Sequence, residues 1–211
     1  MRDMAEIGER AAGIWPVVAH DVVYEAAGRR LVDGVSLTLR PGPLTCIMGP
    51  NGAGKSLLIR LIAGLLRPSA GRITYGVARG ARRARIAELL ALGQLAALAE
   101  QPARVLSGGE QQRLAMVRAL AADPALILLD EPAASLDPQA TGAVEALVRE
   151  AAEGGTKAVL VTHDRDQARR LAGEVVFLNR GRVIERAPAA EFFERPQSPE
   201  AQAYLAGRLL F

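Results

Sequence analysis

The first part of the chain alternates short apolar runs with turn residues, a pattern typical of antiparallel strands. Residues 17–24 contain two short β-branched runs, and residues 31–39 contain a longer apolar run that follows Gly28. β-branched residues favour strands, and glycine favours the tight turn that joins two of them. We therefore predict an N-terminal antiparallel β subdomain, with residues 73–75 as a further edge strand.

From residue 44 onward, apolar runs of strand length alternate with helical patterns. Residues 44–48 predict a strand and residues 56–66 a helix. Residues 126–129 are wholly apolar, which predicts a buried parallel strand. The alternation continues through predicted helices at 138–153 and 165–172 and predicted strands at 158–162, 175–178 and 182–185. This order predicts an α/β fold, mainly a parallel sheet flanked by helices.

The segment between these two blocks is rich in Ala, Leu and Arg and has helical character. Residues 79–99 predict a long helix with a break at Gly93, and residues 109–122 predict a second helix. Four arginines indicate a solvated helix face, with a partner contact as the alternative: Arg79, Arg82, Arg83 and Arg85. We expect residues 77–122 to form a reduced helical subdomain.

The composition excludes some classes of protein but does not identify a binding partner. The 211 residues include 26 basic and 23 acidic side chains, and the net charge of +3 is too small for the basic field of a nucleic-acid-binding protein. Cys46 is the single cysteine, which excludes an internal disulfide and agrees with a reducing cytosol. No apolar run approaches the roughly 20 residues that cross a bilayer. We expect a cytoplasmic protein with a flexible tail at 1–15, one domain at 16–211 and no nucleic-acid partner.

A glycine-rich loop lies between the predicted strand at 44–48 and the predicted helix at 56–66. It has the spacing G-x-x-x-x-G-K-[ST] and consists of Gly49, Pro50, Asn51, Gly52, Ala53, Gly54, Lys55 and Ser56. Glycines let backbone N–H groups turn inward around phosphates, and the helix N-terminus adds partial positive charge. Lys55 is expected to reach the β- and γ-phosphates of a nucleotide, and Ser56 to ligate Mg²⁺. A glycine-rich loop without function is the alternative, and the flanking strand and helix argue against it.

The apolar strand predicted at 126–129 ends in two carboxylates, Asp130 and Glu131. Beside a phosphate loop, Asp130 would join the Mg²⁺ shell and Glu131 would act as general base on the attacking water. Taken alone, such a pair would more simply indicate a helix cap. Its interpretation therefore depends on the loop at 49–56.

Residues 106–113, with the sequence Leu-Ser-Gly-Gly-Glu-Gln-Gln-Arg, resemble the signature of the ABC ATPase family. The resemblance covers the chain from about Val17 to its end, and includes residues 135–138 as the D-loop and His163 as the switch histidine. It implies an ABC-type P-loop NTPase that binds ATP and Mg²⁺. It also implies a homodimer that holds two ATP molecules between its copies.

The resemblance implies roles for individual residues as well. His163 would contact the γ-phosphate and orient the water, although a lone histidine there would be an ordinary surface or half-buried residue. Tyr24 would stack on adenine, although an isolated tyrosine more often packs a sheet. The other implied nucleotide contacts are the loop at 49–56 with Leu57 and, toward the nucleotide of the opposite copy, Ser107, Gly108, Gly109, Glu110 and Asp137.

One part of the chain departs from the family pattern. Lys55 and Ser107 are only 52 positions apart, which is shorter than the family's usual spacing. The shortfall falls between about residues 71 and 85, where no apolar strand ends in the family's glutamine loop. Gln94 and Gln101 lie in the helical segment and are expected to be solvated. We expect MgATP binding to survive, and hydrolysis and its coupling to transport to be weakened.

The C-terminal part of the chain, in residues 166–172, 176–181 and 191–193, resembles the ATPases of oxyanion importers, the tungstate type above the phosphate type. This resemblance implies integral membrane permease partners, an indirect link to a substrate-binding protein and a place on the inner face of the cell membrane. Phe192 and Phe193 are themselves expected to pack a C-terminal helix on the core. Two alternatives stay open: a shortened module that binds ATP without productive hydrolysis, and an ABC ATPase outside transport.

Overall fold

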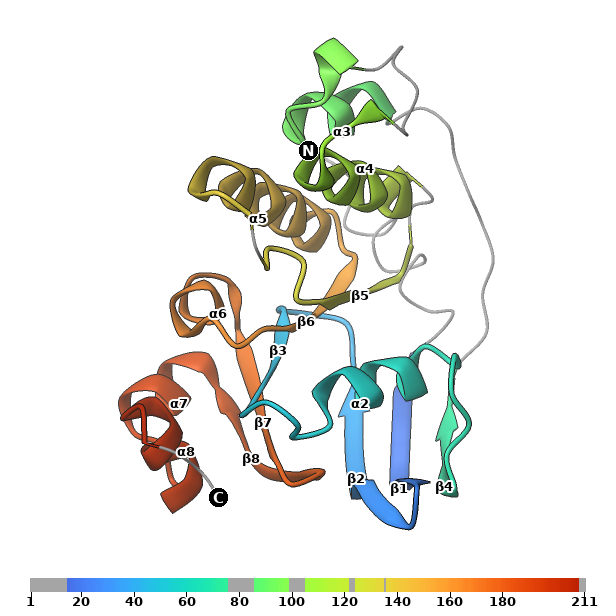
Figure 1. The fold of residues 1–211 in the computed structure, drawn as a ribbon, viewed down its shortest axis with the longest axis vertical. Coiled ribbons are helices and arrows are strands. Elements are labelled where there is room, and N and C mark those ends of the chain that lie inside the picture. The colour runs from blue at the N-terminus through green and yellow to red at the C-terminus, as the bar shows by residue number, and fades with distance from the viewer. Residues whose placement is uncertain (1–14, 76–85, 99–104, 122–123, 135, 209–211) are drawn as a thin grey trace.

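The computed structural model describes residues 15–75, 86–98, 105–121, 124–134 and 136–208 (Figure 1). Near the N-terminus, three strands form an antiparallel sheet of order β2-β1-β4. They are β1 (Val17–Ala26), β2 (Arg29–Leu39) and β4 (Ala70–Thr74). The turn between β1 and β2 contains Gly28 with a positive φ of 70°, as the sequence predicted for a glycine turn. The antiparallel β subdomain is confirmed, with its third strand beginning at residue 70.

A second sheet of five strands forms the centre of the molecule, in the order β5-β6-β3-β7-β8. Its strands are β3 (Thr45–Met48), β5 (Leu126–Asp130), β6 (Lys157–Val161), β7 (Glu174–Asn179) and β8 (Arg182–Pro188). The pairs β5–β6, β6–β3 and β3–β7 are parallel, and β8 pairs antiparallel with β7. The predicted mainly parallel sheet is confirmed.

Successive residues of the central strands point to opposite faces of the five-stranded sheet, so each strand contributes to two cores. In β6, Ala158 and Leu160 belong to a cluster beneath the helices, whereas Val159 and Val161 belong to a cluster against the small sheet and α2 (Lys55–Ile62). A strand covered on both faces must be apolar at every position, which explains the continuous apolar runs of the sequence.

Helices cover the first of these cores. Above the sheet in Figure 1 lie α3 (Ile86–Leu92), the 3₁₀ helix η1 (Ala96–Leu98), α4 (Gly108–Ala121) and α5 (Pro138–Glu153). Toward the C-terminus follow α6 (Arg165–Leu171), α7 (Ala189–Glu194) and α8 (Pro199–Leu205). The α5 helix begins at the predicted residue because Asp137 accepts a hydrogen bond from the Ala140 amide and Pro138 occupies the first turn.

One helix ends earlier than its sequence pattern predicted, and another ends at its predicted break. The α2 helix stops at Ile62, because Gly64 adopts a left-handed conformation with φ of 71° and the Leu65 amide turns back to the Arg60 carbonyl. The α3 helix stops at Leu92, before a turn in which Gln94 has a φ of 57°. The break predicted at Gly93 is confirmed, whereas the stretch 79–85 of that predicted helix and its four arginines lie outside the described residues.

The strand β5 is parallel, as predicted, but it is not buried on both faces. Within the described ranges it is an edge strand that pairs only with β6. Ile127 and Leu129 are buried, whereas Leu126 and Leu128 are only partly buried. The prediction of a buried strand is therefore correct for Ile127 and Leu129 and wrong for Leu126 and Leu128, because β5 lacks a described neighbour on its outer side.

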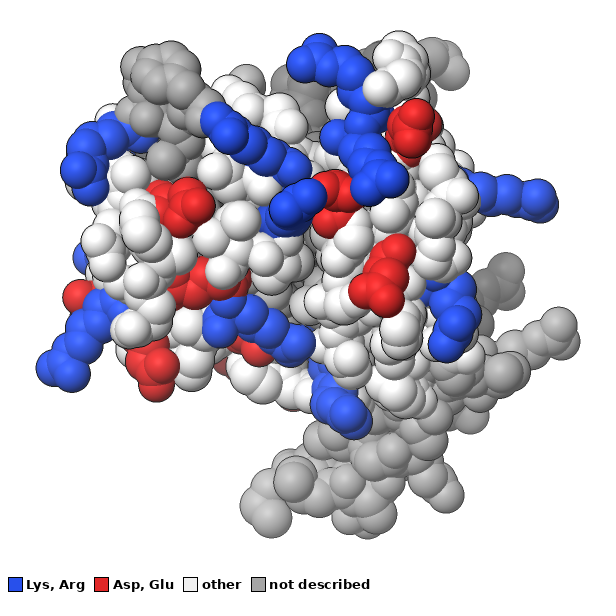
Figure 2. All heavy atoms as spheres, turned by 90° about the horizontal axis from the view of Figure 1, so that it is seen from below, with Lys and Arg blue, Asp and Glu red and all other residues white. Residues whose placement is uncertain are grey.

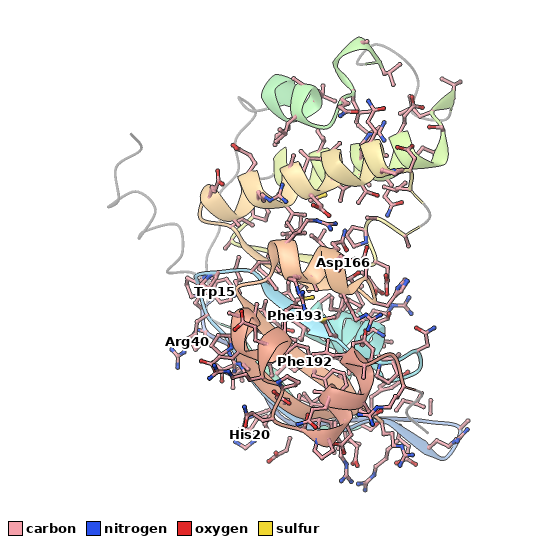
Figure 3. The ribbon with its side chains drawn as sticks, turned by 90° about the vertical axis from the view of Figure 1, so that its left-hand side faces the viewer. Trp15, His20, Arg40, Asp166, Phe192 and Phe193 are labelled. Carbon is pink, nitrogen blue, oxygen red and sulfur yellow. The ribbon has the colours of Figure 1, made fainter. Side chains whose placement is uncertain are left out.

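The two C-terminal helices pack on the central sheet through aromatic side chains. The Phe192 ring is fully buried, and its centroid lies 5.8 Å from that of Phe177 in β7. Phe193 contacts Phe192 edge-to-face at 5.4 Å, and Figure 3 shows both rings on α7 beside α6. The prediction that this pair packs a C-terminal helix on the core is confirmed.

The surface carries charges of both signs. Figure 2 shows basic and acidic side chains interspersed on the face seen from below in Figure 1. Cys46 is buried in β3, and burial raises the pKa of its thiol to about 12. Within the described ranges, every helix is too short or too polar to span a bilayer. Trp15, which we had placed in the N-terminal tail, is partly buried against the small sheet, whereas residues 1–14 are not described.

Candidate functional site

The candidate site lies where three neighbouring parallel strands end. The glycine-rich loop follows β3, Asp130 closes β5 with Glu131 directly behind it, and His163 follows β6. A hydrogen bond of 3.0 Å from the Glu131 amide to the Val161 carbonyl ties the end of β5 to the end of β6. In open α/β sheets, ligands bind outside the carboxyl ends of the strands, so this edge is the expected position for a site.

The glycine-rich loop is shaped by close backbone contacts. A Cβ on Gly49 would lie 2.0 Å from the Leu178 carbonyl oxygen, and a Cβ on Gly54 would lie 2.6 Å from the Leu31 carbonyl oxygen. Gly54 has a left-handed φ of 95° and is the residue from which α2 begins. Only glycine fits both positions, because any side chain would push the loop away from β7 and β2. The loop therefore keeps close to the sheet and continues directly into the N-terminus of α2.

Lys55, the first residue of α2, is held inside the loop. Its side chain is 7% exposed, and its ammonium group donates to the Gly49 carbonyl at 2.9 Å and the Pro50 carbonyl at 3.0 Å. Burial lowers the pKa of this ammonium from its ordinary value, and the carboxylates of Glu131 and Asp130 act in the opposite direction. An ammonium group has three donors, so one stays available for a phosphate oxygen.

Ser56 and Asp130 meet next to the loop. The Ser56 hydroxyl donates to Asp130 Oδ1 at 2.8 Å, across 74 positions of sequence. A hydroxyl and a carboxylate are hard oxygen ligands, and Mg²⁺ commonly takes one or two protein oxygens together with substrate phosphates. The pair therefore fits the predicted Mg²⁺ role, although the described residues contain no cluster of three or more His, Cys, Asp or Glu that could hold a metal alone.

Glu131 and His163 form a second polar pair. His163 Nδ1 lies 2.8 and 2.9 Å from the two carboxylate oxygens of Glu131. Glu131 itself has a φ of 50°, a left-handed conformation that costs a non-glycine residue on the order of 1–3 kcal/mol. Such strain persists where surrounding contacts impose it, and here it turns the carboxylate toward His163. Asp130 and Glu131 thus bond to Ser56 and His163 and not to the amides of a helix N-terminus, so the simpler interpretation of these two carboxylates as a helix cap does not hold.

The predicted signature residues form a separate group within the chain. Figure 1 places α4 with α3 and α5, whereas α2 lies against the small sheet. The Ser107 amide and hydroxyl both donate to Glu110 Oε2, at 2.7 and 2.8 Å, and the Glu110 amide donates back to the hydroxyl at 3.4 Å. This reciprocal arrangement is a capping box at the start of α4. The hydrogen bonds from Ser107 hold the pKa of the Glu110 carboxyl below its ordinary value.

The remaining predicted contact residues have structural partners of their own. Gly108 and Gly109 form the first turn of α4, and Asp137 caps α5, whereas Ser135 of the predicted D-loop lies outside the described residues. Tyr24 lies in β1 opposite Val32, partly buried against the second core. Gly52 and Ala53 lie within the loop, where the Ala53 amide donates to the Pro50 carbonyl, and Leu57 lies in the first turn of α2. Gln94 is exposed, as expected, and Gln101 is not described.

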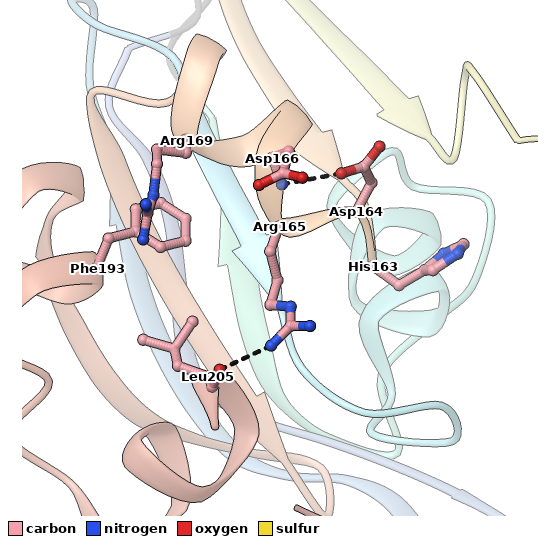
Figure 4. Close-up of a pocket in the computed structure, with 7 residues that line it drawn as sticks. All are labelled: His163, Asp164, Arg165, Asp166, Arg169, Phe193 and Leu205. Carbon is pink, nitrogen blue, oxygen red and sulfur yellow. Dashed lines mark hydrogen bonds between the residues drawn. The ribbon is translucent and has the colours of Figure 1, made fainter. Parts of the chain in front are cut away.

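A pocket of about 450 Å³, which sequence reasoning missed, lies at the segment that begins with His163 (Figure 4). It is lined by His163, Asp164, Arg165, Asp166, Arg169, Phe193 and Leu205. Arg165 donates to the Leu205 carbonyl at 2.7 Å, and the Arg169 guanidinium lies 5.0 Å from the centre of the Phe193 ring. These contacts fasten α6 to α7 and α8, while the His163 imidazole is directed away from them (Figure 4). The partners are far apart in sequence, so no local pattern could have indicated them.

Comparisons with known proteins agree with this geometry. A family model described as ABC transporter matches residues 32–83 and 76–134. The chain is 31% identical to the L-cystine transport system ATP-binding protein TcyN of Escherichia coli (strain K12), over 90% of this chain and 97% of that protein. It is 35% identical to the sulfate/thiosulfate import ATP-binding protein CysA of Xylella fastidiosa (strain 9a5c), over 82% of this chain and 63% of that protein. The chain thus covers less than two thirds of the length of this second relative.

Solved structures give the same result. The dimeric structure of a bacterial ABC transporter cassette aligns with a TM-score of 0.70 at 25% identity, over 82% of this chain and 98% of that chain. The structure of an ATP-binding subunit of an ABC transporter aligns with a TM-score of 0.78 at 22% identity, over 91% of this chain and 98% of that chain. The chain therefore belongs to the ABC transporter family of ATP-binding proteins, and its fold is the ABC-type P-loop NTPase fold.

The comparisons also bear on the shortened region. The alignment with TcyN extends over 242 positions, more than the 211 residues of the whole chain, so this chain lacks residues that TcyN has. The two segments of this chain that the family model matches separately overlap at residues 76–83, so the match is interrupted there. This position lies inside the range 71–85 in which the sequence analysis placed the missing segment.

Proposed function

We propose that the chain is the ATP-hydrolysing subunit of an ABC importer and works as a pair of copies with two MgATP between them. The observation that carries this proposal is the convergence of three polar groups at adjacent strand ends. These groups are the Lys55 loop, the Ser56–Asp130 pair and the Glu131–His163 pair. Phosphate binding, metal binding and water activation are the three tasks that phosphoryl transfer to water requires.

Each group has a definite task in this reaction. The loop amides and the free donor of Lys55 bind the phosphate chain, and Tyr24 stacks on adenine. Bound Mg²⁺, held by Ser56 and Asp130, would neutralise phosphate charge. Glu131 accepts the proton of the attacking water, and His163 holds the carboxylate and contacts the γ-phosphate.

The second half of the nucleotide contact comes from the other copy. Ser107, Gly108 and Gly109 present a helix N-terminus, which favours an anion, and Glu110 and Asp137 lie beside it. Within one chain these groups lie away from the Lys55 loop, so the sandwich needs a second copy. Support comes from a similar ATP-binding cassette, 25% identical, whose structure is a post-hydrolysis dimer bound to ADP and Pi.

The solute is proposed to be an oxyanion, since sulfate/thiosulfate import proteins are among the relatives. The tungstate type is the narrower hypothesis, which the C-terminal sequence motivates. Other relatives are ATP-binding proteins of L-cystine transport and of methionine import, so a permease and substrate-binding partner would decide the solute. We propose a cytoplasmic location on the inner membrane face, with permease subunits as direct partners, a substrate-binding protein as an indirect one and no nucleic acid.

A shortened module that binds ATP without productive hydrolysis is the second candidate. The residues missing relative to TcyN favour it, because the sequence between residues 71 and 85 contains no apolar run that ends in glutamine. Phosphate release by the purified protein decides between the two candidates, with Glu131→Gln as the blank. Release above the blank supports the ATPase, and release equal to the blank leaves only the binding module.

A further inference from the structure

The helix α4, which begins with the predicted signature residues, is hydrogen-bonded to the loop that follows β5. The Gln112 side-chain amide donates to the Pro132 carbonyl at 2.5 Å, across 20 positions of sequence. Pro132 is buried and directly follows Glu131. Proline has no N–H, so its carbonyl is the only backbone group through which this residue can be hydrogen-bonded. Gln112 is the donor that the described structure gives to this carbonyl.

Further contacts hold the same helix and loop together. A Cβ added to Gly109 would lie 3.2 Å from Leu136 Cδ2, so the first turn of α4 packs closely on the end of the loop. On the neighbouring side, Arg113 donates to the Gly93 carbonyl at 3.0 Å. The α4 helix is thus held between the turn after α3 and the loop that follows β5. A shift of α4 would therefore displace the Pro132 carbonyl, because the Gln112 side chain is hydrogen-bonded to it.

The position of Glu131 is sensitive to this attachment. Its backbone is left-handed, its amide donates to the Val161 carbonyl, and its carbonyl accepts from the Ala134 amide. A strained residue reverts to a more common conformation when its surroundings loosen. The carboxylate would then leave its position beside His163.

We infer that Gln112 is a positioning residue: its hydrogen bond to Pro132 holds the Glu131 carboxylate in place and links it to the signature helix. This inference rests on the proposed function. In the proposed dimer, Ser107 of a chain contacts one ATP and Glu131 of the same chain serves the other ATP. Gln112 therefore connects the two ATP sites, so that phosphate contact at one signature helix steadies the general base at the other site.

The central test compares Gln112→Met with Gln202→Met. Methionine has the length of glutamine and no donor. Gln202 is the matched control because its side-chain amide also donates to a proline carbonyl, that of Pro196 at 3.0 Å, from an exposed position on α8. We expect Gln112→Met to lower kcat about tenfold while KM for ATP and the Tm change little, since losing one hydrogen bond shifts a positioning equilibrium by about this factor. Gln202→Met should leave kcat, KM and Tm unchanged.

A second variant isolates the donor. Gln112→Glu keeps the shape of the side chain, but its carboxylate cannot donate at neutral pH. It should lose as much kcat as Gln112→Met. Wild-type kcat in Gln112→Glu would overturn the inference, because the side-chain volume and not the hydrogen bond would then be responsible.

Amide hydrogen exchange tests the attachment independently of turnover. The amides of Glu131, Ala133 and Ala134 should exchange faster in Gln112→Met than in wild type, and at the wild-type rate in Gln202→Met. Unchanged exchange at 131–134 would overturn the inference even if kcat fell. If wild-type turnover does not exceed the Glu131→Gln blank, the proposed ATPase fails, and the exchange rates still decide whether Gln112 holds the Glu131 loop.

Discussion

The strand-end site and the signature helix use polar groups in opposite ways. At the strand ends, groups that are distant in sequence are brought together, as Ser56 and Asp130 are at 2.8 Å, and one donor of Lys55 stays available for a ligand. At the start of α4, Ser107 and Glu110 are neighbours in sequence and satisfy each other. The difference supports the proposal that one chain carries the phosphate-binding groups at its strand ends and, separately, a helix N-terminus that serves the nucleotide of a second copy.

The largest effect is expected at the strand ends. Glu131→Gln should lower ATP turnover about 10²–10⁴-fold, the range that a general base contributes, with ATP affinity unchanged. Phosphate release and equilibrium binding of a fluorescent ATP analogue measure the two quantities. Glu153→Gln, at the exposed end of α5, is the control and should keep full turnover. Equal turnover in both variants would remove Glu131 from the catalytic role.

A smaller but still clear effect is expected in the glycine-rich loop. Gly49→Ala places a Cβ 2.0 Å from the Leu178 carbonyl oxygen, so the loop must move away from β7. Overpacking of this kind costs about 1–3 kcal/mol, and ATP affinity should fall about tenfold or more. Gly142→Ala is the control, because a Cβ there meets no atom within 4 Å and alanine favours the α5 helix. It should raise the Tm slightly, and a loss of ATP affinity in this variant would contradict the account.

A few-fold effect is expected at the signature helix. In the proposed dimer, the start of α4 meets the triphosphate bound by the second copy. Glu110→Gln removes a negative charge there, so ATP-induced dimers should form at several-fold lower protein concentration. The uncharged side chain caps α4 less well, and the Tm of the monomer should be slightly lower. Glu200→Gln removes an acid from the first turn of α8 and controls for the helix-dipole effect alone. Light scattering measures the dimer, and equal dimerisation in both variants would show that Glu110 lies away from the nucleotide.

The smallest effect concerns the pH dependence of the same cap. The hydrogen bonds from Ser107 hold the pKa of Glu110 below its ordinary value of 4.5. Because the folded pKa is lowered, the carboxylate stabilises the protein above about pH 4.5, and this contribution is lost as the pH falls through the folded pKa. The Tm difference between wild type and Glu110→Gln should be constant above about pH 5 and shrink toward pH 3. A difference that grows on acidification would contradict this assignment.

Sequence reasoning predicted the strand-end region well because its signals are local. Lys55 and Ser56 belong to a loop of fixed spacing between a strand and a helix, and Glu131 and His163 each follow an apolar strand. Parallel strands then bring their carboxyl ends to one edge without further information. The sequence could not predict the left-handed backbone of Glu131 or the Glu131–His163 contact, because both depend on the pairing of β5 with β6.

Features that depend on neighbours distant in sequence were harder to predict. The partial exposure of β5 depends on which neighbours it has, and an apolar run does not reveal an edge. The contact of Gln112 with Pro132 joins residues 20 positions apart and leaves no pattern, whereas the Ser107–Glu110 capping box could have been found from the spacing S-x-x-E.

The most direct measurement of the central claim is the mass of the Glu131→Gln protein in solution with and without ATP. Light scattering should give a monomer without nucleotide and a dimer with MgATP, with two ATP molecules retained per dimer. Ser107→Arg, which fills the helix tip, should stay monomeric while still binding ATP. A Glu131→Gln protein that binds ATP and nevertheless stays monomeric at high concentration would contradict the claim that two copies enclose the nucleotide.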